Sequence, residues 1–220
     1  LENFGEEDLK DKSLHRLLRA VPNFIYNFPF EVHDRAIEDK LVDGGSHLIG
    51  FSRLEAYHLF FTHLLKSGHT RILVDEKILK LFRSDSEAFQ LISKMSRIEK
   101  YPNPQSGKLD ENPFLLGEKL ANRLLPKIKA NKFDYIITFS DRIAQGVATV
   151  LSREGIIVPN DIRVMGFDKI DSLSYMKYPI STIEVPLLSM LKDLIAVLEA
   201  KKESNQINRS KPKLLINSDT

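Results

Sequence analysis

The chain has 220 residues, of which 42% are hydrophobic and 28% are charged, as is typical of globular proteins. Its 32 basic and 30 acidic residues nearly balance, so the charge does not indicate a surface for nucleic acid or acidic lipid. The absence of cysteine excludes disulfides, thiolate nucleophiles and cysteine-ligated zinc. No apolar run reaches the ~18 residues of a membrane span, and the acidic start LENFGEEDLK differs from a secretory signal. We therefore expect a cytoplasmic protein without a membrane partner.

Short apolar runs alternate with stretches of helical period in the first hundred residues. Strands are expected at 21–28, 46–52 and 70–76, and helices at 53–68 and 84–96. In the first of these helices one face is apolar, and a glycine at position 68 ends it. The residues of that face are Leu54, Tyr57, Phe61, Leu64 and Leu65.

The segment at residues 100–113, with three prolines and several Asn and Asp residues, is predicted to be a loop at a subdomain crossing. The alternation then resumes, which favours an α/β fold with parallel sheets covered by helices. The expected strands are 133–140, 162–167, 181–185 and 213–217, the expected helices are 114–130, 141–155 and 187–200, and 201–212 is expected to be a polar linker.

Sequence motifs for an enzyme are missing. The chain has no GxxxxGK[ST] loop, no GxGxxG after a strand, no GxSxG elbow and no HExxH pair. His58 and His63 are five residues apart and point to different faces of a helix, so they and His69 are predicted to be surface or loop histidines. We expect no metal, no cofactor and no catalytic residue.

Polar residues follow two of the predicted strands. Ser140 and Asp141 end one strand and open a helix, and Asp168 follows Gly166 at the end of the next. Because ligands gather at the carboxyl ends of parallel strands, these side chains are candidates for binding a small molecule. The alternative is structural, because Ser and Asp also cap helices and form turns. A carboxylate at 168 would accept hydrogen bonds from ligand hydroxyl or ring N–H groups, and Phe139 and Phe167 would supply apolar walls.

The same part of the chain resembles the effector-binding domain of LacI/GalR-family transcription regulators. The resemblance is carried by an ordered set over about fifty residues: Ser140-Asp141, Ala144 and Gly146, the REG turn at 153–155, VPNDI at 158–162, GFD at 166–168, and Pro179 with Thr182. Weaker similarity covers VPNFIYNF, the segment from IGFSRLEAY to RILV, and the terminal KLLINSDT, so that the likeness spans most of the chain.

This resemblance implies a two-lobed fold of the type I periplasmic-binding-protein kind, with an effector, commonly a sugar or purine-like metabolite, held between the lobes. The first lobe is expected to comprise residues 1–98 and 184–209, and the second 99–183 and 210–220. Crossings are expected near 98–102, 181–185 and 209–213.

The resemblance also implies a homodimer. The contact is expected on the helix at 142–154 and on the segment at 175–179, with Ile143, Val147, Tyr175 and Tyr178 as candidates. The family's first strand–helix–strand and its helix-turn-helix have no counterpart here, so the first lobe is expected to be incomplete and DNA to be bound only through a domain outside this chain. A winged helix of the GntR type or an AraC-type module remains open as that domain.

Three positions depart from the family pattern. Ser140 replaces the usual Asn, Lys169 replaces a second acidic residue, and Asp85 occupies the place of the first-lobe arginine, which leaves Arg83 as the candidate cation. The nature of the effector therefore stays open. Two other functions compete with the sensor: a solute-binding protein of a sugar transporter, which would share the fold, and an α/β enzyme such as a sugar-phosphate transferase.

Overall fold

The computed structural model describes residues 25–30, 47–83, 86–102, 111–199 and 207–217. By their internal contacts they group into two compact units. Unit 1 comprises residues 1–53 and 186–212, and unit 2 comprises residues 54–185 and 213–220. No helix among the described residues is long and apolar enough to cross a membrane.

Unit 1 contains a three-stranded parallel sheet in the order β1 (Ile25–Phe30), β2 (His47–Ser52) and β8 (Ile207–Arg209). All six residues of the central strand β2 are buried. Helix α8 (Leu187–Glu199) packs on β2. Strand β8 lies within the segment 201–212, which was expected to be a polar linker. Its backbone pairs with β2 from Leu48 onward, and that pairing outweighs the polar composition.

Unit 2 is built on a four-stranded parallel sheet, which confirms the predicted α/β class. The strand order is β4 (Arg97–Tyr101), β3 (Arg71–Asp75), β5 (Tyr135–Ile137) and β6 (Arg163–Met165). Beyond β6, Ser181 forms a parallel bridge with Met165, and β7 (Thr182–Glu184) then pairs antiparallel with β9 (Lys213–Leu215).

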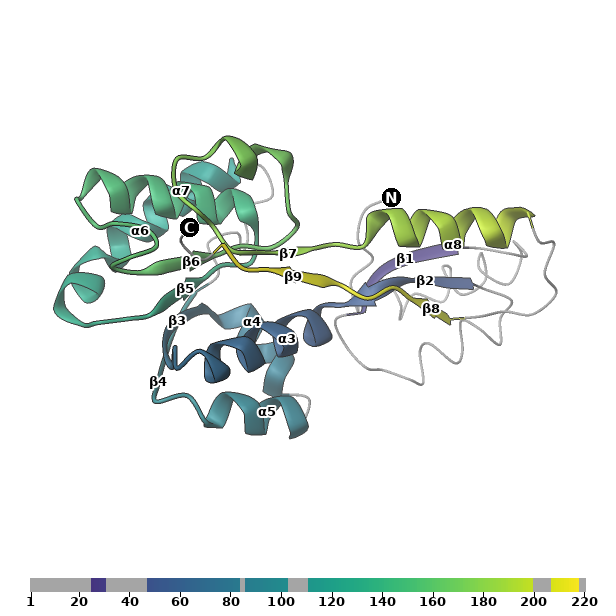
Figure 1. Ribbon diagram of the computed structural model, residues 1–220, viewed down its shortest axis with the longest axis horizontal. Coiled ribbons are helices and arrows are strands. Elements are labelled where there is room, and N and C mark those ends of the chain that lie inside the picture. The colour runs from purple at the N-terminus through teal and green to yellow at the C-terminus, as the bar shows by residue number, and fades with distance from the viewer. Residues whose placement is uncertain (1–24, 31–46, 84–85, 103–110, 200–206, 218–220) are drawn as a thin grey trace. The chain divides into compact units, whose positions relative to one another are not determined.

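Helices cover both faces of this sheet (Figure 1). Helices α3 (Arg53–Lys66), α4 (Glu76–Arg83) and α5 (Ser86–Ser93) lie on one side, and α6 (Pro113–Ala130) and α7 (Asp141–Arg153) on the other. Successive residues of β5 face opposite sides, as the pleat requires. The Tyr135 ring contacts the Phe60 ring of α3 at a centroid distance of 5.3 Å, whereas Ile136 belongs to the core under α6 and α7.

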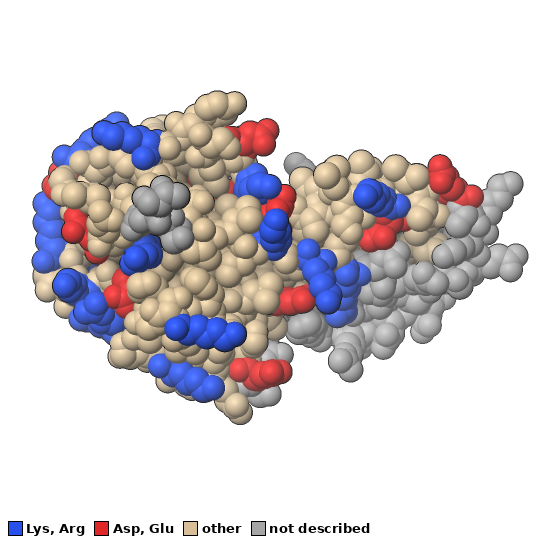
Figure 2. Space-filling view, in the orientation of Figure 1, with Lys and Arg blue, Asp and Glu red and all other residues tan. Residues whose placement is uncertain are grey.

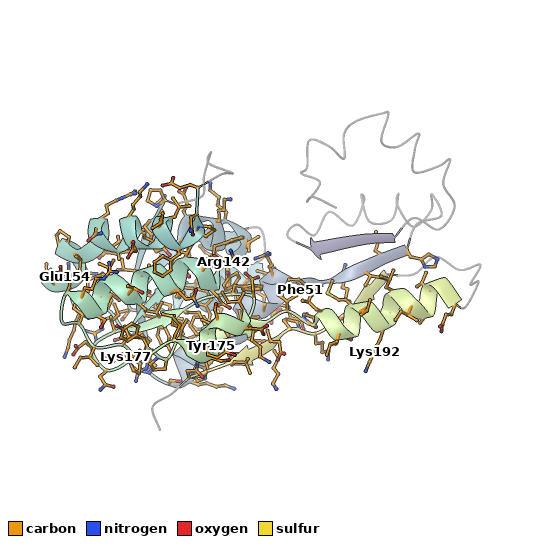
Figure 3. All side chains as sticks on the ribbon, turned by 90° about the horizontal axis from the view of Figure 1, so that it is seen from above. Phe51, Arg142, Glu154, Tyr175, Lys177 and Lys192 are labelled. Carbon is orange, nitrogen blue, oxygen red and sulfur yellow. The ribbon has the colours of Figure 1, made fainter. Side chains whose placement is uncertain are left out.

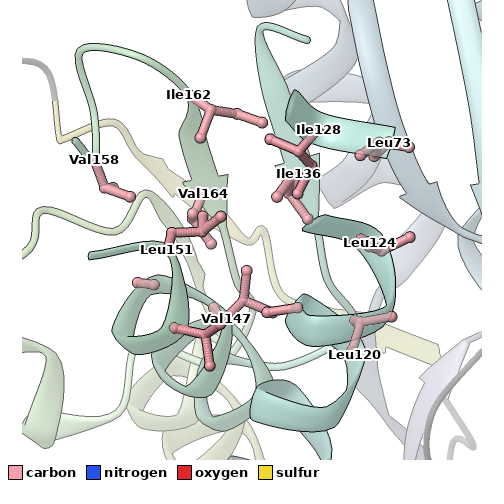
Figure 4. Packing of buried hydrophobic residues seen from close by; sticks show 14 of the residues in the cluster. Leu73, Leu120, Leu124, Ile128, Ile136, Val147, Leu151, Val158, Ile162 and Val164 are labelled. Atoms are coloured by element: carbon pink, nitrogen blue, oxygen red, sulfur yellow. The ribbon is translucent and has the colours of Figure 1, made fainter. Parts of the chain in front are cut away.

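The core under α6 and α7 is aliphatic and is drawn in Figure 4. Its predicted inward residues on α7, which are Ile143, Val147, Val150 and Leu151, are all buried, as the helical period indicated. The two helices approach closely where Gly117 faces Gly146. A Cβ atom added to either glycine would lie only 3.0–3.1 Å from the Cα atom of the other. Helix α6 begins where the Asn112 side chain accepts the Phe114 N–H at 2.9 Å, with Pro113 in the first turn.

Helix α4 and strand β4 were not predicted either. Residues 76–83 form α4 directly after β3, and residues 97–101 form β4 where the loop from residue 100 was expected. β4 (RIEKY) is a sheet edge rich in charged residues, a composition that conceals a strand from hydrophobic patterning but suits an edge.

The predicted lobe boundary between residues 98 and 99 differs from the division into compact units. Backbone pairs join β3 to β4 and to β5, so residues 71–75 and 135–137 belong to one sheet. The first change of unit follows Arg53 instead. The other two changes lie at 185/186 and 212/213, next to the predicted crossings at 181–185 and 209–213.

Candidate ligand-binding site

Strands β3, β5 and β6 are parallel neighbours, so their carboxyl ends meet at one edge of the sheet of unit 2. Asp75 ends β3, Ser140 and Asp141 follow β5, and Asp168 follows β6. Such an edge is where ligands bind in parallel α/β sheets. The structure thus brings together the two predicted polar strand ends and adds a third at Asp75.

Ser140 is the N-cap of α7. Its backbone is extended, and its Oγ faces the Ile143 N–H at 3.5 Å. The Ser140 carbonyl accepts a hydrogen bond from the Thr138 hydroxyl at 2.9 Å. The residue is partly exposed, so the capping alternative holds while the hydroxyl stays at the edge of the sheet.

Asp141 is fully buried and supports the neighbouring loop, so a direct ligand contact at this residue stays a prediction. Its Oδ1 accepts the Thr182 hydroxyl at 2.7 Å, its Oδ2 accepts the Ile170 N–H at 3.0 Å, and its own N–H donates to the Phe167 carbonyl at 2.8 Å. Burial raises the pKa of the Asp141 carboxyl to about 7, although the hydrogen bonds from Thr182 and Ile170 lower it.

The loop that carries Asp168 has an uncommon backbone. Asp168 has φ +108° and Lys169 has φ +56°, and residues other than glycine rarely adopt positive φ angles. Two contacts hold the loop in place. The Asp168 N–H donates a hydrogen bond to the Ile183 carbonyl at 3.0 Å, and Lys169 forms an ion pair with Glu184 at 2.7 Å. Asp168 is partly exposed at the end of β6, as a ligand-binding carboxylate requires.

Gly166 precedes this loop and must remain small. A Cβ atom at this position would lie 2.1 Å from Asp141 Oδ1 and 2.8 Å from its Cα. The close approach of the Gly166 backbone to Asp141 therefore explains why the GFD motif begins with glycine.

The two predicted aromatic walls differ in exposure. Phe167 is fully buried, and its ring lies 5.3 Å from the Tyr57 ring, so it packs in the core, and its role as a ligand wall stays a prediction. Phe139 is partly exposed, and the Lys77 ammonium lies 5.6 Å from its ring centroid. Phe139 thus stays a candidate for an apolar contact.

Asp75 and Tyr101 are buried polar residues at the same edge of the sheet that the sequence analysis did not single out. Asp75 is fully buried, and its Oδ1 accepts the Lys77 N–H at 2.9 Å. The Tyr101 hydroxyl donates to the Ile137 carbonyl at 2.7 Å, and burial followed by the nearby Asp75 charge raises the pKa of Tyr101 well above its usual value. The sequence signal for Asp75 was an acidic residue directly at the end of an apolar strand, the same pattern that singled out Asp141 and Asp168.

The candidate cation Arg83 ends α4, but its side chain lies outside the described residues. The histidines make local contacts: His63 Nε2 lies 3.3 Å from Ser67 Oγ, and the His69 ring lies 5.6 Å from the Tyr135 ring. Within the described part of the chain, no group of three His, Asp or Glu residues is placed to hold a metal ion.

The predicted dimer residues divide into two kinds. Ile143 and Val147 are fully buried in the core under α6 and α7, where the apolar side of α7 faces inward, and their place in an interface stays a prediction. Tyr178 is partly buried against the same core. Tyr175 is 88% exposed at the end of the short 3-10 helix η2 (Asp171–Tyr175), and Figure 3 labels it at the surface of unit 2.

A parallel sheet whose carboxyl edge carries a partly exposed carboxylate is an arrangement common in α/β domains that bind small molecules. Residues 61–216 match the family described as the periplasmic binding protein-like domain, and the chain belongs to this family.

The relatives confirm the resemblance to LacI/GalR regulators. The chain is 28% identical over 151 residues to the transcriptional repressor PurR of Actinobacillus pleuropneumoniae, which covers 64% of this chain and 41% of that protein. For the first curated relatives the alignments span only 22–41% of their length.

Solved structures share the fold. One is a LacI family transcriptional regulator from Enterococcus faecium with bound ribose, with a TM-score of 0.59 and 20% identity over 95% of this chain and 83% of that chain. Another is a dimeric Lac repressor with a C-terminal deletion, with a TM-score of 0.66 and 18% identity over 98% of this chain and 84% of that one.

Proposed function

We propose that this chain is the effector-sensing domain of a transcription regulator in the cytoplasm, and that its effector is a sugar or a related hydroxyl-rich metabolite. The observation that carries the proposal is Asp168, a partly exposed carboxylate held at the carboxyl edge of the sheet by a loop with positive φ angles. Backbone strain of this kind persists where the surrounding structure enforces it, often at binding sites.

The carboxylate of Asp168 would accept two hydrogen bonds from neighbouring ligand hydroxyls, each worth about 1.5–3 kcal/mol. Ser140 and Phe139, both partly exposed at the same edge, would add a hydroxyl and an apolar contact. Arg83 stays a candidate cation. No step in this function requires catalysis, and the relative named above is a repressor by name, which supports a sensor over an enzyme or a transporter component.

DNA binding would reside in a domain outside this chain. On the face drawn in Figure 2, lysine and arginine side chains of unit 2 alternate with acidic ones and form no continuous basic surface. The sensor would then act by changing the arrangement of an attached DNA-binding domain when the effector binds.

A thermal-shift screen tests the function, because a ligand that binds only the native state raises the melting temperature. D-ribose is the first compound to test, followed by other sugars, sugar phosphates and nucleobases. A compound at a hundred times its Kd is expected to stabilise the chain by about 2.7 kcal/mol. If no compound in these classes shifts the melting temperature, the proposed effector class is wrong.

Asp168→Asn is expected to weaken binding of the compound found in that screen about ten- to a hundred-fold in calorimetry, because the amide replaces one accepting oxygen with an NH2 group that donates. Asn also tolerates positive φ, so the loop is expected to keep its backbone. The matched control is Asp171→Asn, the same chemical change at an exposed residue of η2. Equal affinity in the Asp168 variant and the control would reduce Asp168 to a turn residue.

We also propose a homodimer whose contact includes η2 and the adjoining surface of α7. The Gln145 side chain of α7 donates to the Ser172 hydroxyl of η2 at 2.8 Å, so the two elements form one surface. Tyr175→Glu is expected to convert the dimer to monomer in light scattering, because it places a charge on an exposed aromatic contact, whereas Tyr175→Phe is expected to leave it intact. A wild-type monomer at high concentration would contradict this interface.

A further inference from the structure

The carboxyl group of Asp141 joins three segments of unit 2. It lies at the start of α7, its Oδ2 accepts the Ile170 N–H of the loop after β6, and its Oδ1 accepts the Thr182 hydroxyl of β7. The loop thereby connected carries Asp168, and β7 leads into the change of unit after Val185. Asp141 thus lies between the candidate ligand residue and the strand that leaves unit 2.

The Thr182 hydroxyl extends this connection. It accepts the Lys169 N–H at 3.2 Å while it donates to Asp141. Asp168 and Lys169 have φ angles of +108° and +56°, which cost of order 1–3 kcal/mol each and need enforcement from outside the loop. The hydrogen bonds of Asp141 and Thr182 provide that enforcement on the residues that follow Asp168.

Protonation changes what this carboxyl group can do. Oδ1 accepts the Thr182 hydroxyl and Oδ2 accepts the Ile170 N–H, and a backbone hydrogen bond from Lys169 also lowers the pKa of the group. An added proton turns one oxygen into a hydroxyl that donates. One of the two bonds must then weaken or reverse. A backbone N–H can only donate, so a proton on Oδ2 weakens the Ile170 bond, whereas a proton on Oδ1 reverses the Thr182 bond because a hydroxyl can also accept. The ionised group accepts both bonds at full strength, and in the protonated group at least one of them is weakened or reversed.

Both forms are accessible near neutrality. Burial raises the pKa of Asp141 to about 7, and the negative charge of Asp168 raises this pKa further. Asp168 is the charged side chain that acts on Asp141 from the loop after β6. Lys169 follows in the same loop, but its ammonium group pairs with Glu184 of β7 at 2.7 Å.

We propose that Asp141 is a positioning residue that fastens the Asp168 loop to β7 when its carboxyl group is ionised and loosens that loop when the group is protonated. Any effect on effector affinity rests on the function proposed above, but the pH-dependent hydrogen bonding of Asp141 does not. The Asp168 loop would then respond to pH in the neutral range.

The test follows the backbone amide of Ile170 by NMR in the whole chain without ligand, between about pH 5.5 and 8.5. The wild type is expected to show one transition with a midpoint near 7. Asp141→Asn is expected to abolish it. Thr182→Val, which removes the hydroxyl donor, is expected to raise the midpoint, and Asp168→Asn, which removes a neighbouring negative charge, to lower it.

An Ile170 amide that does not titrate, or that still titrates in Asp141→Asn, would overturn the proposal. If Asp141→Asn does not fold, the other two variants decide, and unchanged midpoints in both would overturn it. Calorimetry with D-ribose, or with another compound found in the thermal-shift screen, separates the two claims. Binding without an Ile170 transition would overturn the proposed role of Asp141 and leave the proposed sensor function intact. An Ile170 transition without any binding compound would overturn the sensor function and leave the role of Asp141 intact.

Discussion

Replacing Gly146 with alanine is expected to lower the free energy of unfolding by about 3 kcal/mol. A Cβ atom at this position would lie 2.1 Å from the Phe114 carbonyl oxygen and 2.9 Å from the Glu118 nitrogen, both backbone atoms of α6. A backbone cannot rotate away as a side chain can, so α6 would have to shift as a whole. Leu120 of α6 and Val147 of α7 would then lose part of their packing in the core.

Helix propensity opposes this effect, because alanine stabilises a helix interior by about 1 kcal/mol relative to glycine. The variant is less stable than the wild type only if the cost of the clash exceeds that gain. The sign of the change in unfolding free energy therefore shows whether the two backbones are in close contact. Urea unfolding measures it as a lower midpoint at an unchanged m-value. Gly117→Ala, which meets the Ile143 carbonyl oxygen at 2.2 Å, is expected to behave in the same way.

The matched control is Gly68→Asn. Gly68 has φ +73° with no atom within 4 Å of its Cβ position, and asparagine tolerates this backbone region. This control is expected to cost less than about 1 kcal/mol. A Gly146→Ala variant that unfolds at the wild-type urea midpoint would show that α6 and α7 are not in close backbone contact.

The elements that local chemistry determines were predictable from the sequence. Helix α7 was expected from residue 141 to its closing glycine at 155 and is found at Asp141–Arg153, because its apolar spacing and its Ser140 cap are local features. Strands β3, β5 and β6 were expected because each is a short apolar run after a helix. The resemblance to LacI/GalR regulators rested on the same part of the chain.

The features that depend on distant partners were not predictable. β4 forms because RIEKY pairs with β3, and the first change of unit follows from which strands share a sheet. Neither is encoded in the composition of the segment itself. The predicted interface role of Ile143 and Val147 conflicts with their spacing, which already indicated an inward face, and both residues are fully buried.

The candidate site shows the same division. The position of Asp168 at a strand end could be predicted from the pattern of an apolar run and a glycine. The burial of Asp141 could not, because its main partner, Thr182, lies 41 residues further along the chain. Phe167 is buried because the α3 residue Tyr57 covers it, a contact between segments far apart in sequence.

The difference in stability between the wild type and Asp141→Asn is expected to change steeply with pH. The carboxyl pKa of Asp141 is about 7 in the folded chain, above its ordinary value of 3.8. The native state therefore holds a proton that the unfolded state has lost, so the stability contributed by this group is fully present below pH ~4 and is lost as pH rises through about 7. At about 1.4 kcal/mol per pH unit the loss approaches 4 kcal/mol.

Other groups titrate in the same interval and act in the opposite direction. Burial lowers the pKa of His63 and of His69, so their contribution to stability falls as the pH drops through 6.5. Subtracting the urea-derived stability of Asp141→Asn from that of the wild type at each pH cancels the histidines, because both proteins contain them. The remaining difference is expected to fall between pH ~5 and pH ~7 and to be constant above about pH 8. A difference that stays flat over this interval would mean that Asp141 is ionised throughout, and the carboxyl group would then be permanently fastened to Thr182 and Ile170.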